Sequence, residues 1–164
     1  MWWADQRHVD NVRELLDLKA DSKPLDSPGT NTTGATVDKT LTNDDLRTLV
    51  PKVGGVLIYL SQDVPQIQFA AKCIMSDAQH PTLLTEARLK RAGRYLIGHP
   101  VTEWHYPVQD LPQFVLVEGD ADWAGAEDAK STQCTVMMFG DHCLEVTTSG
   151  QNYVATASAI SDCF

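Results

Sequence analysis

The sequence predicts an α+β protein in which a helical segment over residues 1–100 precedes a region of strands. Apolar residues recur at helical spacing several times before residue 100, whereas after it they form short runs separated by glycine and proline. The hydrophobic content of 43% over 164 residues is enough for a folded core. This length suits one domain, or one small domain with part of another.

The helical segment divides into a first helix, a linker and three further helices. A helix is expected over residues 5–19, capped by Asp5, and residues 20–42 are expected to form a linker across the surface because they lack apolar periodicity. The second helix starts near Asn43, and Pro51 within it predicts a kink or a late start. Two amphipathic helices follow, over residues 67–78 and after His80-Pro81 as far as Gly98.

The strands expected after residue 100 include one hairpin. The first good strand is Phe114–Glu118, after a short one at residues 102–106. Residues 134–139 and 142–147 flank Gly140-Asp141, a pair that suits a two-residue type II′ turn. Residues 153–164 have the pattern of the start of a helix.

The net charge of −9 arises entirely in the second part of the chain, because residues 101–164 hold ten acidic side chains against Lys130 alone. Such a surface repels phosphate backbones unless cations intervene, so the acids are either a solvated face or ligands of a divalent metal. No apolar run is long enough to span a membrane, and Met1-Trp2-Trp3 is too short for a secretory signal. We therefore expect an intracellular protein, cytoplasmic or nuclear, with its four cysteines as free, buried thiols.

The sequence Asp120-Ala121-Asp122, expected at the end of a strand, is the strongest candidate site. It could contribute a metal ligand to a phosphodiester-cleaving centre, where clustered carboxylates hold two magnesium ions. It could instead supply the nucleophile of an aspartyl-phosphate phosphatase, although the lysine that such a site needs is not found at a suitable distance. A third interpretation is two exposed acids at a turn.

The basic side chains of one expected helix form the second candidate, and they are Arg88, Lys90, Arg91 and Arg94. They could contact a nucleic-acid backbone or form a solvated face, and Arg91 could pair with the ring of Tyr95 instead. No small-molecule cofactor is indicated.

An ordered series of segments resembles the pol polyprotein of copia-type LTR retrotransposons, from beyond the polymerase palm into the ribonuclease H domain. The segments that carry the resemblance are Ala4-Asp5-Gln6-Arg7-His8-Val9, Lys23-Pro24-Leu25-Asp26-Ser27-Pro28-Gly29, residues 54–67, residues 89–98, Asp120-Ala121-Asp122-Trp123-Ala124-Gly125 with Lys130-Ser131-Thr132, His142-Cys143-Leu144 and Ser149-Gly150-Gln151. The chain departs from the family at Val64 and Gln66, which replace the arginine and the aspartate of an Arg-Pro-Asp motif, and at Thr147, which replaces a tryptophan.

The resemblance implies a polymerase-exit helix and linker over residues 1–42, a helical connection segment over 43–100, and a truncated ribonuclease H-like domain over 101–164. That domain would consist of a partial mixed sheet, which includes a hairpin, and the start of a helix. Asp120 and Asp162 would be its catalytic, magnesium-binding carboxylates, with further acids expected beyond Phe164.

The function implied is hydrolysis of the RNA strand of an RNA–DNA hybrid, with Mg²⁺ as the metal. Because carboxylates of both active centres are expected outside this chain, we expect it to be catalytically incomplete by itself. A non-catalytic nucleic-acid-binding relic and a small acidic protein-interaction domain remain alternatives. An uncovered sheet would also favour self-association.

Overall fold

The computed structural model describes residues 2–3, 5–19, 21–29, 44–122 and 131–151. The chain divides into a helical unit, which ends at Glu103, and a strand unit, which begins at Trp104. Helices followed by a small sheet confirm the α+β class that the sequence predicts.

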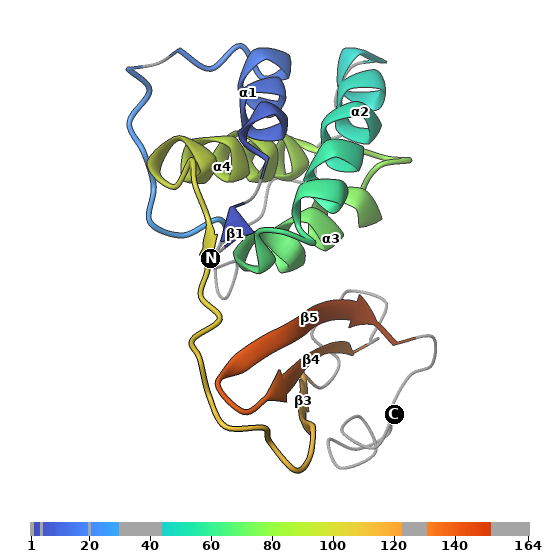
Figure 1. Ribbon diagram of the computed structural model, residues 1–164. Helices are drawn as coiled ribbons and strands as arrows, with labels where there is room; N and C mark the ends of the chain where they lie inside the picture. The colour runs from blue at the N-terminus through green and yellow to red at the C-terminus, as the bar shows by residue number, and fades with distance from the viewer. Residues whose placement is uncertain (1, 4, 20, 30–43, 123–130, 152–164) are drawn as a thin grey trace. The chain divides into compact units, whose positions relative to one another are not determined.

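The helical unit contains four helices: α1 (Gln6–Leu15), α2 (Asp44–Leu60), α3 (Gln68–Ser76) and α4 (Leu83–Gly98). Figure 1 shows α4 running across α1 and α2. A short 3₁₀ turn, η1 (Pro65–Ile67), leads into α3, and the two-residue strands β1 (Trp2–Trp3) and β2 (Glu103–Trp104) pair with each other.

The core of the helical unit is formed by the apolar faces that the periodicity predicted. Val12, Val53, Leu57 and Leu96 are fully buried, and side chains from all four helices join them in one cluster. All the described buried hydrophobic residues lie between Val9 and Leu96. The described part of the strand unit therefore contributes no buried apolar side chain.

Helix α1 is shorter than predicted because Asp17 adopts the left-handed conformation, with φ of 48°. The Asp17 N–H donates to the Glu14 carbonyl oxygen (3.1 Å), and the Leu18 N–H donates to that of Arg13 (3.0 Å). These two bonds form a Schellman motif, which ends a helix by satisfying its last carbonyl groups. The described linker residues after it pack on α4, where the Leu25 N–H donates to the Arg94 carbonyl oxygen (3.3 Å).

Helix α2 runs from Asp44 through Pro51 to Leu60, so the late start that the proline predicted is wrong. Helix α4 starts at a capping box, in which the Thr82 hydroxyl accepts from the Thr85 N–H and the Thr85 hydroxyl accepts from the Thr82 N–H. Its predicted end at Gly98 is confirmed.

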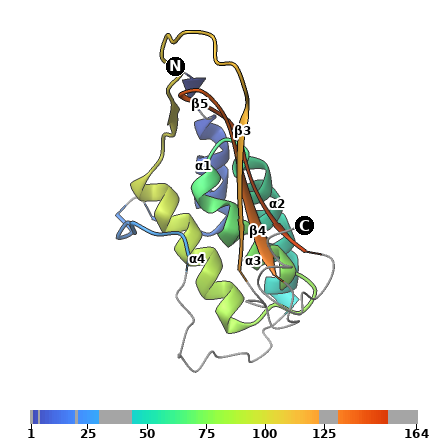
Figure 2. The ribbon, with the colours of Figure 1, turned by 90° about the horizontal axis from the view of Figure 1, so that it is seen from below.

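The strand unit contains a three-stranded antiparallel sheet in the order β3 (Leu116–Ala121), β4 (Thr132–Phe139) and β5 (His142–Gly150). Figure 2 shows the three strands side by side. The predicted hairpin is confirmed, and Gly140 has the positive φ (59°) that the first position of a type II′ turn requires. The parallel pairing of a mixed sheet is not among the described strands, and the helix start expected at residues 153–164 lies outside the described residues.

The loop before β3 is fastened to the hairpin turn by Gln109. Its side-chain NH₂ donates to the Phe139 carbonyl oxygen (2.9 Å), and its side-chain oxygen accepts from the Asp141 N–H (2.8 Å). On the same loop the Pro107 carbonyl oxygen lies 2.7 Å from His142 Nε2. These contacts join the loop at residues 107–109 to the end of β4, to the hairpin turn and to the start of β5.

Candidate functional site

Asp120 is the penultimate residue of β3 and so lies close to the strand end where the sequence predicted it. Its Cα partner on β4 is Cys134, and its side chain is exposed. Because side chains alternate between the faces of a strand, Glu118 shares the face of Asp120. The alternation of side chains along a strand is the sequence signal that identifies Glu118 as a further candidate.

Asp122 has a different role from Asp120. Its side-chain oxygen accepts a short hydrogen bond from the Thr132 N–H, and its own N–H donates to the Thr132 carbonyl oxygen (2.9 Å). The Asp122 carboxylate therefore replaces a backbone carbonyl oxygen in the ladder and holds the end of β3 to β4. The two acids therefore differ. Asp120 is exposed to solvent, whereas Asp122 connects β3 to β4 through its two hydrogen bonds with Thr132, which we call the bracket.

The sheet end next to this bracket is polar and buried. Ser131, Thr132 and Gln151 are 1%, 8% and 5% exposed. The Gln151 N–H donates to the Ser131 carbonyl oxygen (2.8 Å), and the Gln151 side chain donates to that of Gln133 (3.3 Å). This network fixes β5 to β4 at the level where Asp122 fixes β3 to β4, so all three strands are tied at that end.

The donor chemistry of the Asp120 face fits magnesium only in part. Mg²⁺ binds oxygen ligands and is commonly held by one or two carboxylates together with water and substrate phosphates. Asp120 and Glu118 supply such oxygens, but among the described residues no group of three or more His, Cys, Asp or Glu side chains could hold a metal ion together. Asp162, the second predicted ligand, lies outside the described residues.

The four predicted basic residues all lie on α4, and three of them have partners within the helical unit. Arg88 forms an ion pair with Asp77 (2.9 Å), and Lys90 forms one with Glu86 (2.5 Å). Arg94 Nε donates to the Lys23 carbonyl oxygen (2.7 Å). Most of this positive charge is therefore already used to hold the helices and the linker together.

Arg91 is partly buried, and its Nε has no hydrogen-bond partner among the residues that the structure describes. The ring of Tyr95 stacks on His99, with 4.3 Å between the ring centroids. Burial also raises the pKa of the Tyr95 hydroxyl.

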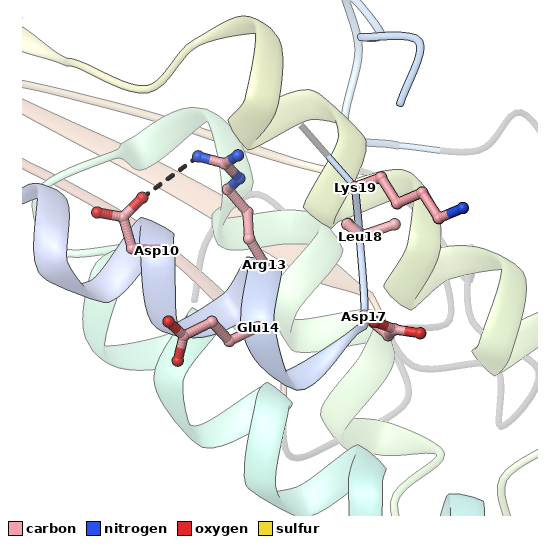
Figure 3. Close-up of a pocket in the computed structure, with 6 residues that line it drawn as sticks. All are labelled: Asp10, Arg13, Glu14, Asp17, Leu18 and Lys19. Carbon is pink, nitrogen blue, oxygen red and sulfur yellow. Dashed lines mark hydrogen bonds and ion pairs between the residues drawn. The ribbon is translucent and has the colours of Figure 1, made fainter. Parts of the chain in front are cut away.

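A shallow hollow of about 530 Å³ lies beside α1 and the residues that follow it (Figure 3). The side chains that line it are Asp10, Arg13, Glu14, Asp17, Leu18 and Lys19. Arg13 reaches Asp10 across 3.3 Å, whereas Lys19 extends away from the other side chains. Charges of both signs alternate around this hollow, so it does not present the convergent donors of a site for an ion of one sign.

Two titratable groups near the start of α1 have shifted pKa values. The Arg7 guanidinium, hydrogen-bonded to Asp5, lowers the pKa of that carboxyl from 3.8 to about 2. Burial raises the pKa of Asp63, and the neighbouring His8 opposes this shift. Both groups lie in the helical unit and belong to its packing.

The three described cysteines, Cys73, Cys134 and Cys143, are free thiols, as predicted, although they are partly exposed and not buried. None of the described helices has the length and apolar character that crossing a membrane requires.

The comparisons with known proteins find no family model that matches this chain, and no curated protein or solved structure that resembles it.

Proposed function

We propose that the strand unit acts as part of a ribonuclease H-type domain, with Asp120 as a magnesium ligand, within a reverse transcriptase/ribonuclease H of the copia type. The observation that carries this proposal is the different placement of two neighbouring acids. Asp120 is exposed on a strand, whereas Asp122 is bound to the backbone of Thr132. The resemblance, too, implies metal binding by Asp120 and assigns none to Asp122.

The chemistry expected at this site is hydrolysis of the RNA strand of an RNA–DNA hybrid. Magnesium, when bound, would activate a water molecule and stabilise the leaving oxygen. Asp120 would supply an oxygen ligand, and its place inside an antiparallel ladder keeps that ligand at a fixed position. Glu118, on the same face, would add negative charge that attracts the cation.

We expect the 164-residue chain by itself to bind magnesium weakly and to leave hybrids uncleaved. A two-metal site needs several convergent carboxylates, and beside Glu118 and Asp120 the next acid along this face, Asp122, is already bound to the Thr132 N–H. Activity would then depend on carboxylates supplied by a longer product. Such an enzyme would work in the cytoplasm or the nucleus.

The contribution of α4 to nucleic-acid binding is expected to be small. Of the two basic residues of α4 that form ion pairs, Lys90 has the more exposed side chain (59%), but its ammonium group is already bound to Glu86. Arg88 would have to leave Asp77 before it could contact a phosphate. Nucleic-acid binding through this helix should therefore be weak, and its dependence on salt should be shallow because few phosphate contacts can form.

A protein-interaction domain is the second candidate, and the exposed apolar residues at the start of β3 favour it. Phe114 is 71% exposed and Val117 is 54% exposed, and the region carries a net negative charge. Exposed apolar patches of this kind commonly mark protein-binding surfaces.

Manganese, which broadens the NMR signals of nearby amides, can test the metal site without any activity. We expect titration of the full chain with Mn²⁺ to broaden the amide signals of Gly119, Asp120 and Cys134 first. The variant Asp120→Asn should lose this effect, whereas Asp110→Asn, at another exposed acid of the strand unit, should keep it. Equal broadening around Asp110 and Asp120 would contradict the proposed site. Cleavage of a labelled hybrid by the chain alone would contradict its incompleteness.

A further inference from the structure

Strand β3 is an edge of the three-stranded sheet, because its only partner among the described strands is β4. The large apolar side chains at the start of this strand and just before it are exposed on the two faces of the sheet. Val115, Leu116 and Val117 are 48%, 45% and 54% exposed. Natural edge strands are usually protected from pairing by charged side chains, especially lysine, by proline or by a bulge, and of these β3 has only the charges of Glu118 and Asp120. The only register shift in the described sheet lies between Met137 and Met138, in the β4–β5 pair.

The hydrogen bonds at Asp122 show which backbone groups of β3 face outward. The Asp122 N–H donates to the Thr132 carbonyl oxygen, so these residues form a hydrogen-bonded pair. In an antiparallel ladder such pairs alternate with pairs that are not hydrogen-bonded. Residues of even number in β3 therefore bond to β4, and Val117, Gly119 and Ala121 direct their N–H and C=O groups to the free edge. The bond from the Gln151 N–H to the Ser131 carbonyl oxygen fits the same alternation across β4.

This edge can pair antiparallel with a second copy of itself in a register that sets no acid opposite another acid. Its first part is apolar, and its second part carries Glu118, Asp120 and Asp122. A twofold axis at Glu118 would place two Glu118 carboxylates directly opposite each other, which destabilises a sheet. An axis at Val117 pairs Leu116 with Glu118 and Val115 with Gly119 of the other copy, and no two acids are opposite. It also uses the outward N–H and C=O groups of Val117 in both copies.

We propose that β3 pairs with β3 of a second copy of this chain, antiparallel about a twofold axis at Val117, to form a continuous six-stranded sheet. The short overlap makes the association weak, because only about five residues of each strand take part. The net charge of −9 opposes the approach of two copies, so added salt should strengthen the association by screening this repulsion. A contact that depended on opposite charges would show the reverse dependence on salt.

Cysteine crosslinking of the full chain tests this register. In a background with the native cysteines replaced by serine, Val117→Cys places two thiols opposite each other across the axis, and mild oxidation should give a disulfide-linked dimer. The control Ala121→Cys lies on the same edge and the same face of the sheet. Its two thiols would be eight residues apart along the pair, or roughly 27 Å, so that variant should not form the disulfide.

Sedimentation of the unmodified chain provides the second measurement, with a concentration-dependent dimer expected. Val117→Pro removes the outward N–H without touching the β3–β4 ladder and should shift the chain to monomer, whereas Val117→Thr keeps the N–H and should still dimerise. Circular dichroism of each variant shows whether the fold is kept. Sedimentation as a monomer at every concentration, or equal crosslinking of the two cysteine variants, would overturn the proposal.

Discussion

Asp122 binds the backbone of Thr132 through both its carboxylate and its own N–H, which makes it a structural bracket between β3 and β4. Asp120, two residues earlier, is exposed on the strand opposite Cys134. The Asp120-Ala121-Asp122 motif thus contains one acid with a structural role and one whose carboxylate is available to a ligand.

Removing the bracket should destabilise the sheet. Asp122→Ala leaves the Thr132 N–H, which lies at a buried residue, without its acceptor, and such a loss costs about 1–3 kcal/mol. Hydrogen exchange should then become faster at Thr132 and along the β3–β4 pair. Asp120→Ala is the matched control and should leave exchange unchanged. Equal protection in the two variants would show that the bracket adds nothing to stability.

Two glycines of the helical unit, Gly93 and Gly55, should respond in opposite ways to substitution by alanine. A Cβ at Gly93 would lie 2.6 Å from Leu18 Cδ1 and 2.7 Å from Leu16 Cδ1, so Gly93→Ala overpacks the α1–α4 contact at a cost of about 1–3 kcal/mol. Gly55 has open space around its Cβ position within α2, so Gly55→Ala should stabilise by up to about 1 kcal/mol. Urea unfolding followed by circular dichroism measures both. Stabilisation by Gly93→Ala would mean that α1 does not pack on α4 as described.

The end of α1 offers a stabilising substitution. Asp17 holds a left-handed conformation that glycine and asparagine adopt more readily, and its negative charge lies near the unfavourable end of the helix dipole. Asp17→Asn and Asp17→Gly should both raise the unfolding free energy by a few tenths to about 1 kcal/mol. Asp21→Gly, at an exposed turn residue without positive φ, should not stabilise.

The Gln109 contact should control the mobility of the hairpin turn. Gln109→Ala removes both bonds to the turn, each of which contributes about 0.5–1.5 kcal/mol, so the Asp141 amide should exchange faster. Gln113→Ala, an exposed glutamine of the same loop, is the control and should have no effect on that amide. Gly140→Ala should disturb the turn more strongly, because Gly140 has a positive φ and a Cβ would lie 2.8 Å from Pro112 Cγ.

Asp63 gives a prediction about pH. Burial raises its folded-state pKa above the unfolded value, so its charged form opposes folding, and protonation on acidification relieves this effect. Asp63→Asn should therefore raise stability at pH 7. This advantage should begin to shrink as the pH falls through the raised folded-state pKa and should be gone below the unfolded-state pKa of 3.8. Urea unfolding of both proteins across this range checks the sign, and an advantage that grew on acidification would contradict it.

The sequence predicted those parts of the fold that depend on local pattern. Helical periodicity identified the buried faces of α2 and α4, including Leu57 and Leu96, and Gly140-Asp141 identified the hairpin. Contacts between residues far apart in the chain were not predictable in this way. The bond from Arg94 to Lys23 and the ion pair of Arg88 with Asp77 give basic side chains structural partners that no local pattern indicates.

The candidate site was predictable only as a group of residues. Alternation along a strand could have placed Glu118 beside Asp120, but the different role of Asp122 depends on its register with Thr132 across β4. That register is fixed by the sheet as a whole, and a two-residue motif does not contain it.

The assignment of metal binding to Asp120 and of a structural role to Asp122 can be tested by comparing Asp120→Ala with Asp122→Ala. Two quantities are measured in each variant: the Mn²⁺-induced broadening of the Gly119 amide signal and the hydrogen exchange of the Thr132 amide. We predict that Asp120→Ala abolishes the broadening and leaves exchange unchanged. We predict that Asp122→Ala accelerates exchange and that its remaining folded population still shows the broadening. Loss of the broadening in Asp122→Ala alone, with Asp120→Ala like the unmodified chain, would contradict the assignment of the metal ligand to Asp120.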